Sequence, residues 1–100
     1  MINHIVMWKL KEEAEGADKK SNALKIKTML ESLIGKIECI DYLEVGININ
    51  SSDSAYDAAL YSKFKDLKAL EEYQNNPEHK KVSEFVGKVR EARTVVDYEV

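Results

Sequence analysis

The chain has 100 residues, of which 44% are hydrophobic and 33% charged, and its net charge is −3 at pH 7. This length predicts one compact domain over residues 1–100, and the interleaved charges disfavour nucleic acid as a partner. Cys39 is the only cysteine, so no intramolecular disulfide can form, and no apolar run approaches the ~18 residues that a membrane span needs. The N-terminal residues lack the pattern of a signal peptide. We therefore expect a cytoplasmic protein that does not enter membranes.

The first third of the chain predicts a strand followed by a helix. Residues 2–10 are rich in β-branched and aromatic side chains and end at a polar stretch, which is typical of a strand. Over residues 19–35, apolar side chains (Ile34 among them) recur at spacings of three and four, which predicts an amphipathic helix. Gly35 stands where the cap of this helix is expected.

The rest of the chain predicts two strands, two helices and a closing strand. In chain order we expect a strand over 37–49, a strand over 56–65, helices over 67–73 and from Pro77 onward, and a last strand over 92–100. Gly46 could mark a bulge, while Asp66 and Asn76 can cap the two helices. The order β-α-β-β-α-α-β is that of a ferredoxin-like α+β unit.

Apolar side chains on both faces of the predicted sheet indicate that something covers each face. Three helices can cover only one face, and an antiparallel sheet with a wet face should alternate cleanly between apolar and polar residues. The simplest cover for the other face is a second copy of the chain, packed by two-fold symmetry. We therefore predict a homodimer. The alternative is a monomer that exposes a few apolar residues.

Tyr73 and His79 are the candidate catalytic residues, and His4 is a polar strand residue that could share their pocket. His79 lies in the first turn of a predicted helix, where the helix dipole disfavours an imidazolium, and a neutral imidazole can act as a general base. The Tyr73 hydroxyl could donate to a developing oxyanion, and His4 lies on an apolar strand face. Together they could support proton abstraction beside a carbonyl group. The alternative is an exposed His79, a Tyr73 that only packs in the core, and a His4 bonded to backbone.

Other chemistries lack their residue patterns. The histidines, the cysteine and the carboxylates show no metal-ligand spacing, so no metal site is predicted from side chains. The four glycines are isolated, which argues against a phosphate or dinucleotide loop, and no serine lies in a nucleophile elbow. We therefore expect no cofactor.

Three segments resemble the stress-responsive A/B barrel (Dabb) family over nearly the whole chain. They are "INHIVMWKLK", "YDAALYSKFKDLKALEEYQNNPEHKKV" and "RTVVDYEV". The strongest parts of the resemblance are His4 before an apolar strand, the spacing Y-x-x-x-P-x-H from Tyr73 to His79, and the closing "VDYEV". The resemblance implies a dimeric α+β barrel made of two ferredoxin-like units.

The resemblance also implies candidate roles for several residues. Most bacterial members have no known activity, whereas plant members include stress-induced proteins and a polyketide cyclase. The strand histidine, catalytic tyrosine and catalytic histidine of the cyclase correspond to His4, Tyr73 and His79. That enzyme performs an aldol condensation without metal or cofactor, with histidine as base. A second strand histidine of its pocket corresponds to Ala58, and the first helix here lacks the aromatic residues of that pocket.

By the same resemblance, a ligand pocket should lie between the sheet and the helices. The expected lining residues are His4, Val6, Trp8, Leu60, Phe64, Val82 and Phe85. Some plant relatives hold magnesium through backbone carbonyls after the first helix, and residues 33–40 could do likewise.

Three functions remain open. The first is a homodimer that binds a small apolar or carbonyl-containing molecule, with no established activity. The second is a cofactor-independent lyase or cyclase that uses His79 as base and Tyr73 as donor. The third is a cofactor-free or haem-degrading monooxygenase.

Overall fold

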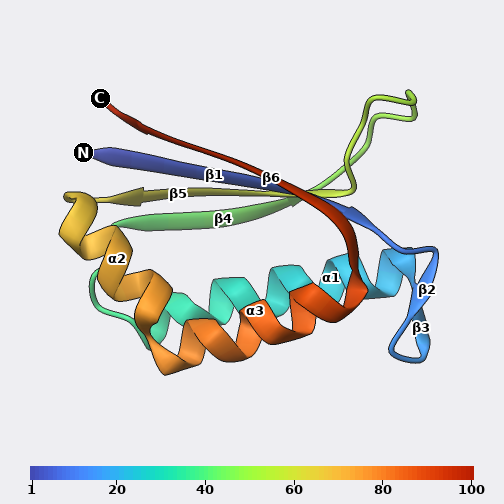
Figure 1. Ribbon diagram of the computed structural model, residues 1–100, viewed down its shortest axis with the longest axis horizontal. Helices are drawn as coiled ribbons and strands as arrows, with labels where there is room; N and C mark the ends of the chain where they lie inside the picture. Colours follow the sequence, from blue (N-terminus) through green and yellow to red (C-terminus); the bar gives the residue numbers. More distant parts are fainter.

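The computed structural model describes residues 1–100 and consists of an antiparallel sheet with helices on one face (Figure 1). The sheet has the order β4-β5-β1-β6, and its strands are β1 (Ile2–Leu10), β4 (Tyr42–Ile47), β5 (Ala58–Phe64) and β6 (Arg90–Glu99). The helices are α1 (Lys19–Glu31), the 3-10 helix η1 (Ser32–Gly35), α2 (Leu67–Asn75) and α3 (Pro77–Val89). A small hairpin, β2 (Glu13–Ala14) and β3 (Ala17–Asp18), precedes α1. Apart from this hairpin, the predicted order and the ferredoxin-like fold are confirmed.

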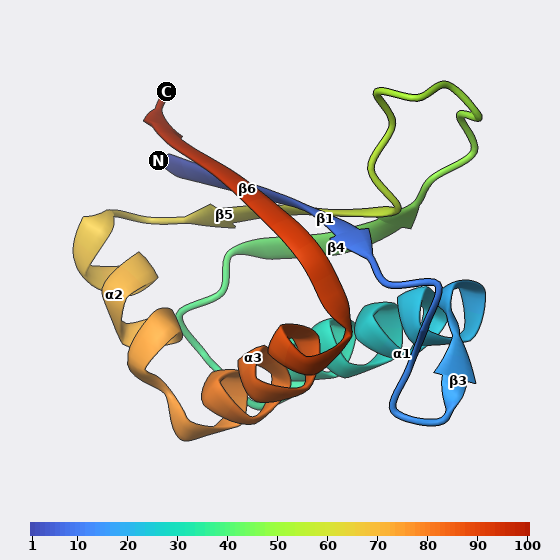
Figure 2. The same ribbon diagram turned by 45° about the vertical axis from the view of Figure 1, so that its right-hand side comes forward.

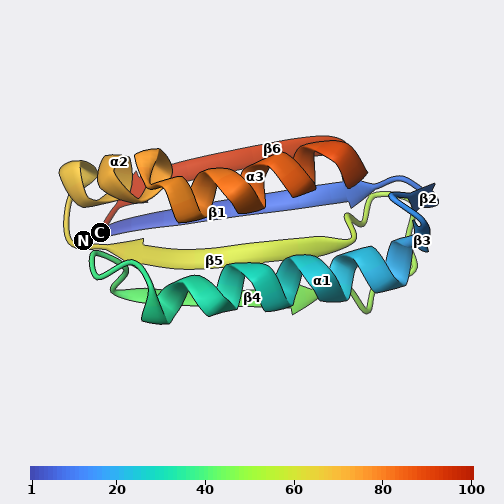
Figure 3. The same cartoon turned by 90° about the horizontal axis from the view of Figure 1, so that it is seen from below.

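The helices lie along the sheet in two rows. Seen from the helix side, α1 lies in front of β4 and β5, while α2 and α3 lie in front of β1 and β6 (Figure 3). Figure 2 shows how β6 leaves the end of α3 and crosses over to pair with β1. None of these helices is long and apolar enough to cross a membrane.

The even-numbered side chains of β1 point toward the helices and form the centre of the core. Val6, Trp8 and Leu10 are buried there, as is Phe64 from β5. The odd-numbered side chains point to the other face, which no part of the chain covers (Figure 1). One chain therefore forms an open four-stranded sheet rather than a closed barrel.

Two predictions about the second strand are wrong. β4 begins at Tyr42 instead of residue 37. The residues before Tyr42 lead the chain from the helix layer back to the sheet, and Ile37 among them is buried in the core. Gly46 marks no bulge, since it pairs in regular register with Ala59. The register shift of this sheet lies between Lys9 and Leu10, where β1 pairs with β6.

The end of the first helix also differs from the prediction. α1 ends at Glu31, and the chain continues as η1, which has about three residues per turn instead of 3.6. This tighter turn rotates Ile34 away from the core, so that it is 53% exposed. Gly35 is not in the left-handed region; the positive φ angles fall at Glu15 and Gly16, in the turn of the unpredicted β2–β3 hairpin. α2 reaches Asn75, and β6 starts at Arg90, each slightly beyond its predicted bounds.

Candidate functional site

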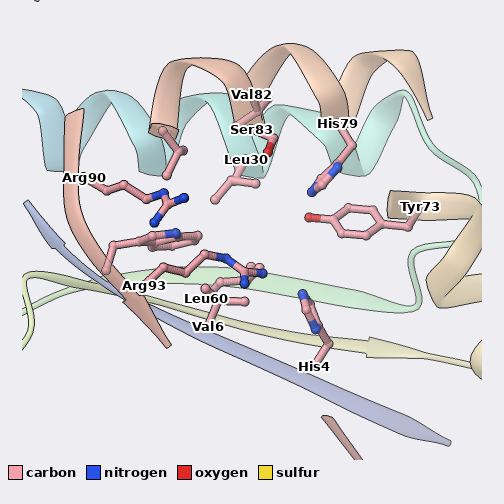
Figure 4. A pocket seen from close by; sticks show the side chains of 12 residues that line it. His4, Val6, Leu30, Leu60, Tyr73, His79, Val82, Ser83, Arg90 and Arg93 are labelled. Atoms are coloured by element: carbon pink, nitrogen blue, oxygen red, sulfur yellow. The ribbon is translucent and has the colours of Figure 1, made fainter. Parts of the chain in front are cut away.

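A cavity of about 260 Å³ lies between the sheet and the helices (Figure 4). Side chains from five main elements and the start of β6 line it: His4, Val6, Trp8, Leu30, Leu60, Tyr73, His79, Val82, Ser83, Val86, Arg90 and Arg93. Most of these side chains are apolar. The polar groups gather at two ends, with Tyr73 and the histidines at one and the arginines at the other (Figure 4).

The break between α2 and α3 brings Tyr73 and His79 together. Asn76 ends α2 and caps α3, with its Oδ1 accepting a hydrogen bond from the backbone N–H of Glu78 at 2.8 Å. Pro77 follows at the first helical position, where its missing N–H costs nothing. The chain turns sharply at this point, so the rings of Tyr73 and His79 face each other with centroids 4.4 Å apart.

The Tyr73 hydroxyl is buried and has no hydrogen-bond partner within the chain. Burial raises the pKa of this phenol well above its ordinary value of 10, and a weaker contribution comes from Cys39. The hydroxyl therefore stays protonated at neutral pH and can donate a hydrogen bond. Figure 4 shows it directed into the cavity.

His79 is half-buried, and its Nδ1 lies 3.2 Å from the carbonyl oxygen of Gln74. A carbonyl can only accept, so in this contact the ring proton is on Nδ1 and the lone pair is on Nε2. Burial lowers the pKa of the imidazole below 6.5, with smaller contributions from the charges of His4 and Arg93. The ring is consequently neutral at pH 7, as a general base requires.

His4 is buried at the floor of the cavity, where its Nδ1 hydrogen-bonds the Asp97 carboxylate. Because a carboxylate accepts, this contact places the ring proton on Nδ1 and holds the imidazole in one orientation. The His4 ring also contacts Tyr73 edge-on, with centroids 6.4 Å apart. The ring of His4 therefore bonds a side chain and not the backbone. The sequence alone predicts no role for its partner, Asp97.

Seven of the predicted site residues line the cavity, and two do not. Those at the cavity are His4, Val6, Trp8, Leu60, Tyr73, His79 and Val82. Phe64 lies behind Tyr73, fully buried, with ring centroids 4.9 Å apart. Phe85 is half-buried beneath the Lys25 ammonium, which lies 4.5 Å from the ring centroid. The catalytic and binding roles of the seven stay predictions.

Sequence reasoning missed Leu30, Ser83, Val86, Arg90 and Arg93 as cavity residues. The two arginines did carry a signal, because they are the only arginines in a chain with 13 lysines.

No cluster of three or more His, Cys, Asp or Glu side chains could hold a metal ion. In the segment after α1, the carbonyl of Leu33 accepts from the amides of Lys36 and Ile37, and the carbonyl of Ile37 accepts from Ile40. These two carbonyls are thus already engaged, and a magnesium site in residues 33–40 stays a prediction.

The fold and the cavity define a ferredoxin-like α+β protein with a polar-ended pocket between sheet and helices. Residues 2–100 match the family model of the Stress Responsive A/B Barrel Domain, and the chain belongs to this family. An uncharacterized protein of Streptomyces coelicolor, SCO4036, is 33% identical over 79 residues, which cover 79% of each chain.

Two solved structures are informative about the fold. A dimeric ferredoxin-like protein of unknown function from Bacteroides fragilis superposes with a TM-score of 0.88 at 33% identity, covering 99% of this chain and 95% of the other. A hydroxynitrile lyase from Passiflora edulis superposes with a TM-score of 0.79 at 16% identity, covering 99% and 92%. The second likeness concerns the fold alone.

Proposed function

We propose that this protein binds a small carbonyl compound in the cavity and does so as a homodimer. The observation that carries the proposal is the buried Tyr73 hydroxyl, which has no partner in the chain. A buried donor without an acceptor costs roughly 1–3 kcal/mol. A carbonyl oxygen of a ligand would satisfy this donor, since the raised pKa of Tyr73 keeps its proton in place.

The size of the cavity favours a small ligand. Its volume of about 260 Å³ lies just below the range of roughly 300–1,000 Å³ that is usual for pockets of drug-sized molecules. Haem would need more room than this, so the cavity supports a compact aliphatic or aromatic ketone better than it supports a haem-degrading oxygenase. The apolar side chains of Leu30, Leu60 and Val82 would contact the body of such a ligand.

Two observations support the homodimer. The uncovered face of the sheet presents exposed apolar side chains, among them Met7, Val96 and Tyr98. The relative from Bacteroides fragilis, at 33% identity, is described as dimeric and has the same fold. Packing two such faces together would complete a barrel and bury both.

A second candidate function is cofactor-independent proton transfer of the aldol or lyase type. The neutral His79 ring, with its lone pair on Nε2, shares the cavity with the Tyr73 donor. His79 would take a proton from the carbon beside the carbonyl, while Tyr73 stabilised the developing enolate oxygen. A lyase from Passiflora edulis is built on this fold, although its low identity transfers no residue roles.

Ketone binding tests the first candidate. We expect acetophenone and short aliphatic methyl ketones to bind the wild type, and Tyr73→Phe to weaken this binding about fivefold or more, because the ligand oxygen loses its donor. Titrations followed by protein NMR would measure the dissociation constants. Tyr56→Phe, which removes a hydroxyl from the loop between β4 and β5, is the matched control and should change nothing. Equal binding by wild type and Tyr73→Phe, or no binding by any ketone, would overturn the proposal.

A further inference from the structure

Arg90 and Arg93 form a positively charged end of the cavity that ketone binding does not explain. They are the two arginines of the chain, and both line the cavity, across from Tyr73 and His79 (Figure 4). Both residues are exposed, so this end of the cavity is open to solvent. The protein as a whole is acidic, with a net charge of −3, which makes a local pair of cations at a pocket mouth unusual.

Neither guanidinium has a partner within the chain. Every ion pair with a basic residue in this protein involves a lysine or His4, and neither arginine side chain makes a hydrogen bond to another residue. Each planar guanidinium carries about five N–H donors, and none of them is bonded to another residue at the mouth of the cavity. Two cations that face one space repel each other, and an anion between them would offset that repulsion.

The register shift in the sheet determines which charge faces the cavity. Along most of their length β1 and β6 pair regularly, with Trp8 opposite Arg93 and Lys9 opposite Ala92. Regular pairing would next place Glu91 opposite Leu10, but the shift places Arg90 there instead. Paired residues point to the same face of a sheet, and Leu10 points toward the helices. The shift therefore directs Arg90, rather than the carboxylate of Glu91, to the side of Arg93.

We propose that the natural ligand carries a carboxylate, held by Arg90 and Arg93 at the mouth, while its carbonyl oxygen reaches Tyr73 at the inner end. The proposal rests on the proposed function and names the class of its ligand, a small oxo-carboxylic acid. Arginine suits this task because its planar fork matches the two oxygens of a carboxylate. The C-terminus of α3 favours a positive charge at Arg90 as well, but Arg93 lies within a strand and has no such role.

Matched pairs of probes separate the carboxylate from the carbonyl. The carboxylate probes are 3-acetylbenzoate, 4-acetylbenzoate and 4-oxopentanoate; the neutral partners are acetophenone and 2-pentanone; benzoate carries the charge without the ketone. We expect at least one oxo-acid to bind the wild type about tenfold or more tightly than its neutral partner, and Arg93→Gln and Arg90→Gln each to remove most of that difference. Lys88→Gln removes one positive charge from the outer side of α3 and should leave the difference intact.

Binding of acetophenone provides the internal control for folding, because the Tyr73 ring contacts His4, Phe64 and His79 and neither arginine bonds its hydroxyl. Arginine variants that bind acetophenone normally but have lost the preference for the oxo-acid would support the proposal. If neutral ketones bind and no oxo-acid binds more tightly, or if the preference survives in the Arg90→Gln/Arg93→Gln double variant, the carboxylate proposal fails while ketone binding stands. If benzoate binds through the arginines but no ketone responds to Tyr73→Phe, the proposed function fails and the anion site stands.

Discussion

At the scale of single residues, burial acts in opposite directions on the two candidate catalytic groups. It raises the pKa of Tyr73 and lowers the pKa of His79, because in each case it disfavours the charged form. The result is a neutral donor beside a neutral acceptor at pH 7. Such a pair can give a proton to one atom of a ligand and take a proton from another, which is what enolisation of a ketone requires.

The charge state of His79 leads to a prediction about pH. The groups that face its ring are Tyr73, His4 and Arg93, and its folded pKa lies below 6.5. We expect the wild type to exchange the methyl protons of a bound ketone for deuterium, at a rate that holds through pH 6.5 and falls only below it. NMR of the ketone in D₂O measures this rate. His79→Gln should reduce it to the solvent background; exchange that persists in this variant would exclude His79 as the base.

The lowered pKa of His79 also makes the free energy of unfolding depend on pH. Between pH 6.5 and the lower folded pKa, the unfolded chain binds a proton at His79 that the folded chain does not. The contribution of this residue to the free energy of unfolding is therefore fully present above pH 6.5 and is lost as the pH falls through that window.

At the scale of elements, the site depends on the break between α2 and α3, which falls at the single residue Asn76. Asn76 satisfies backbone groups at the start of α3, and Pro77 prevents α2 from continuing through this point. A continuous helix would place positions 73 and 79 on different sides, since six residues correspond to about 600° of rotation, or 240° around the axis. The break allows both rings to face one cavity.

Removing the cap should therefore weaken both the fold and the site. We expect Asn76→Ala to lower the free energy of unfolding by about 1 kcal/mol and to weaken ketone binding, because the first turn of α3 carries His79. Urea denaturation and ketone titration measure the two effects. Asn76→Asp keeps an acceptor oxygen at the cap and should retain both properties. Wild-type stability in Asn76→Ala would show that the cap has no energetic role.

At the scale of the whole molecule, the open face of the sheet is an apolar surface that no part of the chain covers. Side chains from β1 and β6 that point away from the helices include Ile5, Met7, Val96 and Tyr98. β4 and β5 add the neighbouring, tilted rings of Tyr42 and Tyr61. An antiparallel sheet with an apolar face can pack face to face against a second sheet. The cavity lies on the other side of the sheet, so dimerisation would leave its mouth accessible.

A charge introduced on this face should separate the subunits. We expect light scattering at micromolar concentration to show about twice the chain mass for the wild type and the mass of one chain for Val96→Glu. A two-fold interface would bury two unpaired carboxylates, each at a cost of several kcal/mol. Leu24→Glu is the control, because Leu24 is 49% exposed on α1 and Val96 is 53% exposed on the open face. A monomeric wild type, or a Val96→Glu dimer, would contradict the homodimer.

The elements that the sequence by itself determined are those coded by neighbouring residues. The β-branched and aromatic side chains of residues 2–10 specified the first strand, and the "NNP" segment specified where one helix ends and the next begins. These signals also sufficed to select Tyr73 and His79, because a single short turn separates them. The sequence predicted the end of α1 less well, because a change from 3.6 to about three residues per turn has little effect on which residue types occur there.

Only the tertiary structure decided which distant residues meet. The contact between His4 and Asp97 joins positions 93 residues apart, and it exists because β1 pairs with β6 in one register. The arrival of Arg90 at the cavity in place of Glu91 depends on a shift of one residue in that same pairing. Since successive side chains of a strand point to opposite faces, a register set by packing across the whole sheet decides which charge a pocket receives, and no local pattern contains that information.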